Sequence, residues 1–111
     1  MRGASGAALA ALALLAGCGG AGTPTATRAR IPLTPQERHG RQLFLRDCGS
    51  CHRLADAGTG GTAGPNLDEH PWREVYVREV IASGPGLMPA GLAGGRDADA
   101  ISAYLASVSR R

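Results

Sequence analysis

The chain has 111 residues, which is enough for one domain at most. Its 12 basic residues are all arginine and stand against nine acidic residues, for a formal net charge of +3. These charges are scattered and interleaved along the chain, which excludes a strongly basic nucleic-acid-binding protein. Alanine and glycine make up a third of the residues and only four are aromatic. We therefore expect the core to depend on a staple, a metal or a cofactor.

Residues 1–17 are predicted to be a lipoprotein signal peptide. Arg2 supplies a positive charge, and an apolar run over residues 7–16 follows it. A membrane-spanning helix needs about 20 apolar residues, so this run fits an export signal instead. The sequence LAGC at residues 15–18 resembles the lipobox of bacterial lipoproteins, in which the cysteine is acylated and becomes the first residue. We therefore predict lipidation at Cys18; the alternative is an ordinary signal peptide with an incidental cysteine.

Residues 18–33 are predicted to be a flexible linker between this anchor and the domain. They are rich in glycine, threonine and proline and show no apolar periodicity. A flexible chain of this length has a root-mean-square reach of about 20 Å, at roughly 5–6 Å times the square root of its length. The folded domain is expected to comprise residues 34–111.

The first predicted helix of this domain begins at Thr34 and runs to about Arg46. Thr34 and Glu37 have the spacing of a capping box, and Pro35 suits the first helical position. The inward face of this helix is predicted to carry Gly40, Leu43, Phe44 and Cys48. The glycine on that face predicts that another backbone approaches closely there.

Two further helices are expected, separated by loops rich in glycine and proline. One runs from near Pro71 to the residue before Gly84, and the other from about Arg96 to Val108. The apolar spacing of both fits one helical face. Their predicted buried residues are Tyr76, Val77, Val80, Ile81, Ile101, Tyr104, Leu105 and Val108. No strand-like alternation persists and no repeat is visible, so the predicted class is all-α.

The motif CGSCH at residues 48–52 carries the chemistry. Cys-x-x-Cys-His is the attachment sequence of c-type haem. In this interpretation Cys48 and Cys51 form thioethers with the haem vinyl groups, and His52 is the proximal iron ligand. Two alternatives are a thiol–disulfide redox pair and half of a zinc site. The first lacks a βαβ context, and the second lacks another ligand pair.

Met88 is the predicted second axial ligand. It is the only methionine left after removal of the signal peptide, and it lies between Pro85 and Pro89 in a loop. A lone methionine usually fills a core, but this one falls outside any helical face. His39, His70 or an open position are the alternatives for the sixth coordination site.

The sequence from about Thr34 to Arg111 resembles the class I monohaem cytochromes c. The resemblance rests on CGSCH, on the spacing of Gly40 and Phe44 before it, on GPNL at residues 64–67 and on GPGLMP at residues 84–89. It implies a cytochrome c fold, with three main short helices and long loops around one covalently attached haem. It also implies that the carbonyl of Pro65 accepts a hydrogen bond from Nδ1 of His52.

Two features depart from the family. Many members surround the haem edge with lysines, whereas this chain has none. Removal of Arg2 with the signal peptide lowers the net charge to +2, so long-range steering of partners should be modest. Trp72 either bonds a haem propionate, as a tryptophan does in some members, or packs in the core.

These observations predict a non-enzymatic one-electron carrier, tethered by lipid to the outer face of the cytoplasmic membrane and serving redox proteins there. The alternatives are a haem-based gas sensor or peroxidase-like enzyme with a labile sixth ligand, and a fixed subunit of a larger complex. The haem is expected to complete the core, and the haem-free protein to be largely unfolded. The side chains expected to pack against it are Leu43, Phe44, Leu67, Val80, Ile81, Leu87 and Leu105.

Overall fold

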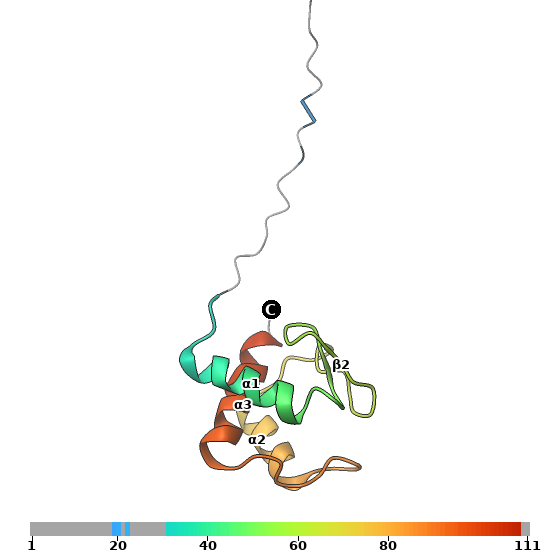
Figure 1. The fold of residues 1–111 in the computed structure, drawn as a ribbon, viewed down its shortest axis with the longest axis vertical. Helices are drawn as coiled ribbons and strands as arrows, with labels where there is room; N and C mark the ends of the chain where they lie inside the picture. The colour runs from blue at the N-terminus through green and yellow to red at the C-terminus, as the bar shows by residue number, and fades with distance from the viewer. Residues whose placement is uncertain (1–18, 21, 23–30, 110–111) are drawn as a thin grey trace, which may run out of the picture.

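The computed structural model describes residues 19, 20, 22 and 31–109, and these contain three helices and one short hairpin (Figure 1). Helix α1 spans Pro35–Asp47, α2 spans Glu74–Ser83 and α3 spans Gly95–Val108. The predicted all-α class is confirmed. The predicted signal peptide and Cys18 lie outside the described residues.

Helix α1 begins as its capping box predicts. The Glu37 N–H donates to Thr34 Oγ1 at 3.2 Å, and the Thr34 N–H donates to Glu37 Oε2 at 2.7 Å. These two bonds satisfy donors that a helix start leaves without partners, and Pro35 occupies the first turn without losing a bond. The helix therefore starts at a defined residue and delivers its C-terminal end, at Asp47, to the haem-attachment motif.

Helix α3 is the centre of the core and packs against both other helices. All its residues from 100 to 106 are buried, and four of these are alanine or serine. Such small side chains let neighbouring helices approach closely. At the crossing with α1, a Cβ on Gly40 would collide with the backbone carbonyl of Ala100, so only glycine fits. Phe44 and Tyr104, which are almost fully buried, pack edge to face beside this contact, with ring centroids 6.0 Å apart.

The structure contains one short hairpin that the sequence pattern did not indicate. Two-residue strands β1, Arg53–Leu54, and β2, Thr59–Gly60, pair antiparallel, with Leu54 opposite Thr59. Strands this short cannot show an alternating sequence pattern, and side-chain bonds stabilise them instead. The Thr59 hydroxyl accepts from the Leu54 N–H at 3.1 Å and donates to the His52 carbonyl at 2.9 Å. The hairpin is thereby fixed to the last residue of the CGSCH motif.

The second helix starts later than predicted, and one residue predicted to be buried is exposed. Helix α2 begins at Glu74 because the Trp72 N–H bonds Ser109 Oγ at 2.9 Å and Arg73 is extended. Val77 and Ile81 are buried as predicted, and Val80 is half-buried. Tyr76 is 52% exposed, contrary to the prediction.

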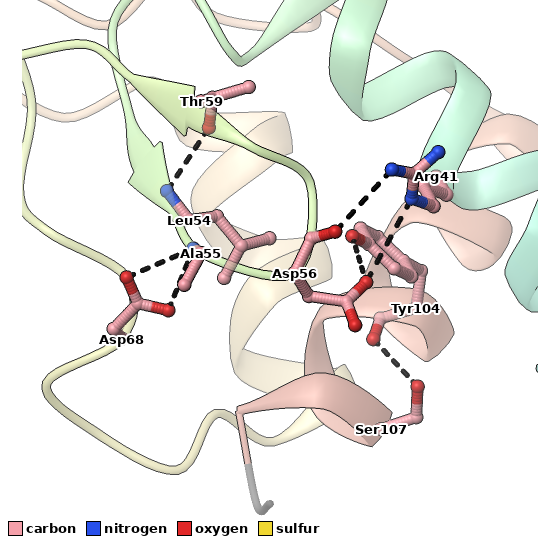
Figure 2. A network of polar contacts seen from close by, with 8 residues as sticks. All are labelled: Arg41, Leu54, Ala55, Asp56, Thr59, Asp68, Tyr104 and Ser107. Atoms are coloured by element: carbon pink, nitrogen blue, oxygen red, sulfur yellow. Dashed lines mark hydrogen bonds and ion pairs between the residues drawn. The ribbon is translucent and has the colours of Figure 1, made fainter. Parts of the chain in front are cut away.

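A polar network connects the hairpin to α1 and α3 (Figure 2). Asp56, in the hairpin turn, accepts from the Tyr104 hydroxyl at 2.7 Å and lies 3.9 Å from Nε of Arg41. On the other side of the turn, both carboxylate oxygens of Asp68 accept from the Ala55 N–H at 3.0 Å. The bonds of Asp56 hold the hairpin against α1 and α3, and that of Asp68 holds it to the loop that follows.

Replacing Tyr104 with phenylalanine is expected to lower the free energy of unfolding by about 1.5–3 kcal/mol at pH 7, the value of a hydrogen bond to a charged group. Burial, and then the bond to Asp56, raise the pKa of Tyr104. The unfolded chain therefore loses this proton first, near the ordinary tyrosine pKa of about 10. The contribution of Tyr104 to the free energy of unfolding is therefore fully present below pH 10 and is lost as the pH rises above it. Urea unfolding of the haem-loaded protein from pH 8 to 11 checks this, and parallel losses in wild type and Tyr104→Phe would contradict it.

Candidate functional site

The CGSCH motif forms a compact turn at the end of α1. The Cys48 N–H bonds the Phe44 carbonyl at 2.9 Å and so ends the helix, and the Cys51 and His52 N–H groups both bond the Cys48 carbonyl. Cys48 is buried and Cys51 is exposed, and both are free thiols. Burial, and then the charge of Asp47, raise the pKa of Cys48 to about 11. The turn thus presents one inner and one outer thiol, followed directly by an imidazole.

The ring of His52 is held in one orientation from the loop that follows the hairpin. Its Nδ1 donates to the Pro65 carbonyl at 2.9 Å, the contact that the family resemblance implies. The Gly64 N–H bonds the Cys51 carbonyl at 2.8 Å, which brings this loop against the ring. A Cβ on Gly64 would lie 2.8 Å from Nδ1, so a side chain there would displace the imidazole. With Nδ1 committed as a donor, Nε2 keeps its lone pair for a metal.

His52 and Met88 line the same cavity, which has a volume of about 650 Å³. Both cysteines of the motif also line it. Five of the seven side chains expected to pack against the haem are among its lining residues: Phe44, Leu67, Val80, Ile81 and Leu87. Leu43 and Leu105 are buried but are not among the lining residues.

These donors fit a haem better than a bare metal ion. In the part of the chain that the structure describes, no group of three or more His, Cys, Asp or Glu side chains is arranged to hold a metal. One imidazole and one thioether at an apolar cavity instead suit a metal whose other ligands come from a large apolar cofactor. Cys48, Cys51, His52 and Met88 are the residues that would hold it.

Met88 belongs to a loop that folds back on the end of α2; we call residues 84–91 the Met88 loop. The Met88 N–H bonds the Pro85 carbonyl at 3.2 Å, and the Gly91 N–H bonds the Ile81 carbonyl at 2.9 Å. Met88 itself is half-buried and packs against the core, whereas Leu87 is 94% exposed. Both residues line the cavity, and Met88 is the more buried of the two.

The two other histidines do not line this cavity. Nε2 of His39 lies 3.1 Å from Oδ1 of Asp97, where α1 meets the start of α3. His70 is exposed and packs edge-on against Trp72, with ring centroids 5.9 Å apart. Of the residues considered for the sixth coordination site, Met88 alone has its side chain at the cavity.

Trp72 packs in the cavity wall, which was one of its two expected roles. Its Nε1–H donates to the Leu67 carbonyl at 2.8 Å, so the polar end of the indole already has a backbone partner. The ring stacks on Tyr76 at a centroid distance of 5.8 Å and an interplanar angle of 8°. This stack explains why Tyr76 remains on the surface. The stack was not expected, because the helical spacing of Tyr76 with Val77, Val80 and Ile81 predicted a buried ring.

No helix among residues 19, 20, 22 and 31–109 is both long enough and apolar enough to cross a membrane.

Comparisons with known proteins agree with this site. Residues 35–105 match the family described as cytochrome C oxidase, cbb3-type, subunit III. The chain is also similar to the crystal structure of the c-type cytochrome SorU from Sinorhizobium meliloti, with 35% sequence identity and a TM-score of 0.63. That similarity covers 67% of this chain and 91% of SorU. No curated protein matches the chain significantly. Because the family match spans more than half of the sequence and the fold agrees, the chain belongs to this family of monohaem class I cytochrome c domains.

Proposed function

We propose that this protein is a membrane-tethered one-electron carrier that holds a single haem c through Cys48 and Cys51, with His52 and Met88 as axial ligands. The observation that carries the proposal is that the side chains of His52 and Met88, 36 residues apart in the chain, line one apolar cavity. Haem bound there supplies an iron that alternates between the ferrous and ferric states.

Met88 and the apolar cavity favour the ferrous state, whereas the bond to His52 acts against it. The Pro65 carbonyl fixes the tautomer of His52 and raises the basicity of its Nε2, and a more basic ligand stabilises ferric iron. Met88 offers a soft, neutral thioether, which raises the reduction potential. The apolar side chains of the cavity disfavour the additional charge of ferric iron. A relatively high potential is the combined result.

Ligation by both His52 and Met88 leaves no coordination position for a substrate, so electrons cross by outer-sphere transfer. Cys51 is exposed, and the Met88 loop places Leu87 at the surface beside the cavity. These residues mark the side from which a partner protein approaches. With a net charge of +2 after processing, this contact depends little on long-range steering.

The tether is proposed from Cys18 and residues 18–33. Two acyl chains on Cys18 are sufficient for stable anchoring, and the linker gives the domain a reach of about 20 Å. Confinement to the outer face of the cytoplasmic membrane raises the effective concentration of redox partners without a tight interface. A fixed subunit of a larger complex would instead co-purify with its partners after detergent extraction.

The decisive experiment is the optical spectrum of the haem-loaded protein, oxidised and reduced, with and without carbon monoxide. Ligation by Met88 predicts a weak long-wavelength ferric band and no response of the ferrous protein to carbon monoxide. Absence of the band together with a rapid spectral shift on adding carbon monoxide would contradict the proposal. It would support the gas sensor or peroxidase-like enzyme with a labile sixth ligand.

A further inference from the structure

Gly84 lies where the end of α2 meets the Met88 loop, in a conformation that favours glycine. Its φ and ψ angles are 58° and 66°, and its N–H bonds the Val80 carbonyl at 2.9 Å to end the helix. A Cβ at this position would collide with the backbone N of Ala90 and lie 2.6 Å from the carbonyl oxygen of Met88. Both neighbours are backbone atoms, so neither can rotate out of the way.

The Met88 loop has little freedom to absorb such a displacement. Pro85 and Pro89 fix two of its φ angles, and the bond from the Gly91 N–H to the Ile81 carbonyl closes it on α2. A displacement of the backbone at Met88 and Ala90 therefore also moves the Met88 side chain.

We propose that Gly84 is a positioning residue for the Met88 ligand. Because Gly84 has no side chain, the Met88 carbonyl and the backbone of Ala90 pack directly against it, and this contact holds the thioether at the cavity wall. The inference rests on the proposed function, in which Met88 is an axial ligand. It extends that function to a residue that touches neither the cofactor nor the thioether.

Gly84→Ala is expected to increase the fraction of ferrous protein in which Met88 is detached. Carbon monoxide binds only that fraction, so its apparent affinity rises by the same factor, which we expect to be about tenfold. The long-wavelength ferric band should weaken in parallel. A loss of stability that left the ligand in place would change neither the carbon monoxide affinity nor the ferric band.

Gly91→Ala is the matched control. Gly91 also has a positive φ, of 66°, in the same loop, but its Cβ would meet nothing within 4 Å. It does not line the cavity, and alanine keeps the N–H that bonds Ile81. The two variants thus share the backbone strain and differ in the collision. Gly91→Ala should keep the wild-type band and carbon monoxide response.

Gly84→Asn keeps the test informative if alanine prevents folding. Asparagine tolerates the left-handed conformation at the end of a helix, yet it carries the Cβ that collides. It should therefore behave as Gly84→Ala does. A wild-type response in either Gly84 variant, or equal responses in Gly84→Ala and Gly91→Ala, would overturn the positioning role alone. A wild-type protein that lacks the band and binds carbon monoxide at once would overturn the ligation by Met88 and this inference with it.

Discussion

Protein produced without haem is expected to be largely unfolded at neutral pH and room temperature. The apolar cavity lined by His52 and Met88 has a volume of about 650 Å³. Without haem, the apolar side chains that line this open cavity would face water, and each one that haem buries contributes about 1.5–3 kcal/mol. A domain of about 80 residues is stable by only about 4–12 kcal/mol, at roughly 0.05–0.15 kcal/mol per residue. Losing the burial of a few such side chains therefore leaves little stability.

Far-UV circular dichroism and amide hydrogen exchange of the full chain, with the haem-loaded protein as the control, check this expectation. Amides of α2 and of the Met88 loop should exchange as in an unfolded chain, because residues of both segments form the cavity wall. The contact between α1 and α3 at Gly40 does not involve the cavity and should retain the most protection. A cooperative haem-free state with protected amides throughout would contradict the argument.

Local signals in the sequence were sufficient for much of the fold. The bonds that start α1 connect residues three positions apart, so the capping box at Thr34 and Glu37 predicts them directly. Helical spacing likewise predicts the burial of Ile101, Tyr104, Leu105 and Val108 on α3, but not that of the small residues between them. The CGSCH motif likewise keeps its two cysteines and its histidine within one turn. Structural features that depend only on residues close together in the chain can therefore be predicted from the sequence.

Features set by contacts between distant segments could not be predicted in this way. The hairpin exists because the Thr59 side chain bonds the backbone of His52 and Leu54 across the turn, and threonine forms such bonds in many settings. Helix α2 starts late because Trp72 bonds Ser109, 37 residues further along. A Cβ on Gly64 would meet the ring of His52 and one on Gly84 the backbone of Ala90, and glycine is common throughout this chain. In each case the contacting residue can be identified only once the fold is known.

The position of His52 shows how local and distant effects combine at the site. Its place in the motif is local, but its orientation depends on Pro65, 13 residues further along, and the family resemblance was needed to expect that bond. Its backbone carbonyl accepts from Thr59, whose hairpin is bonded through Asp56 to Tyr104 (Figure 2). The core packing between α1 and α3 therefore also supports His52. Met88 has no comparable polar support, and its position depends on the backbone of its own loop.

Met88→Ala is expected to lower the reduction potential by on the order of 100 mV or more, a fraction of the roughly 0.8 V range that axial ligands span. Alanine removes the thioether that favours ferrous iron, and neither His39 nor His70 lines the cavity to replace it. The long-wavelength ferric band should disappear, and the ferrous protein should bind carbon monoxide rapidly. Redox titration and the optical spectrum measure these changes. His70→Ala is the control: it should keep the wild-type potential and band, and loss of the band in this variant would transfer the ligand role from Met88 to His70.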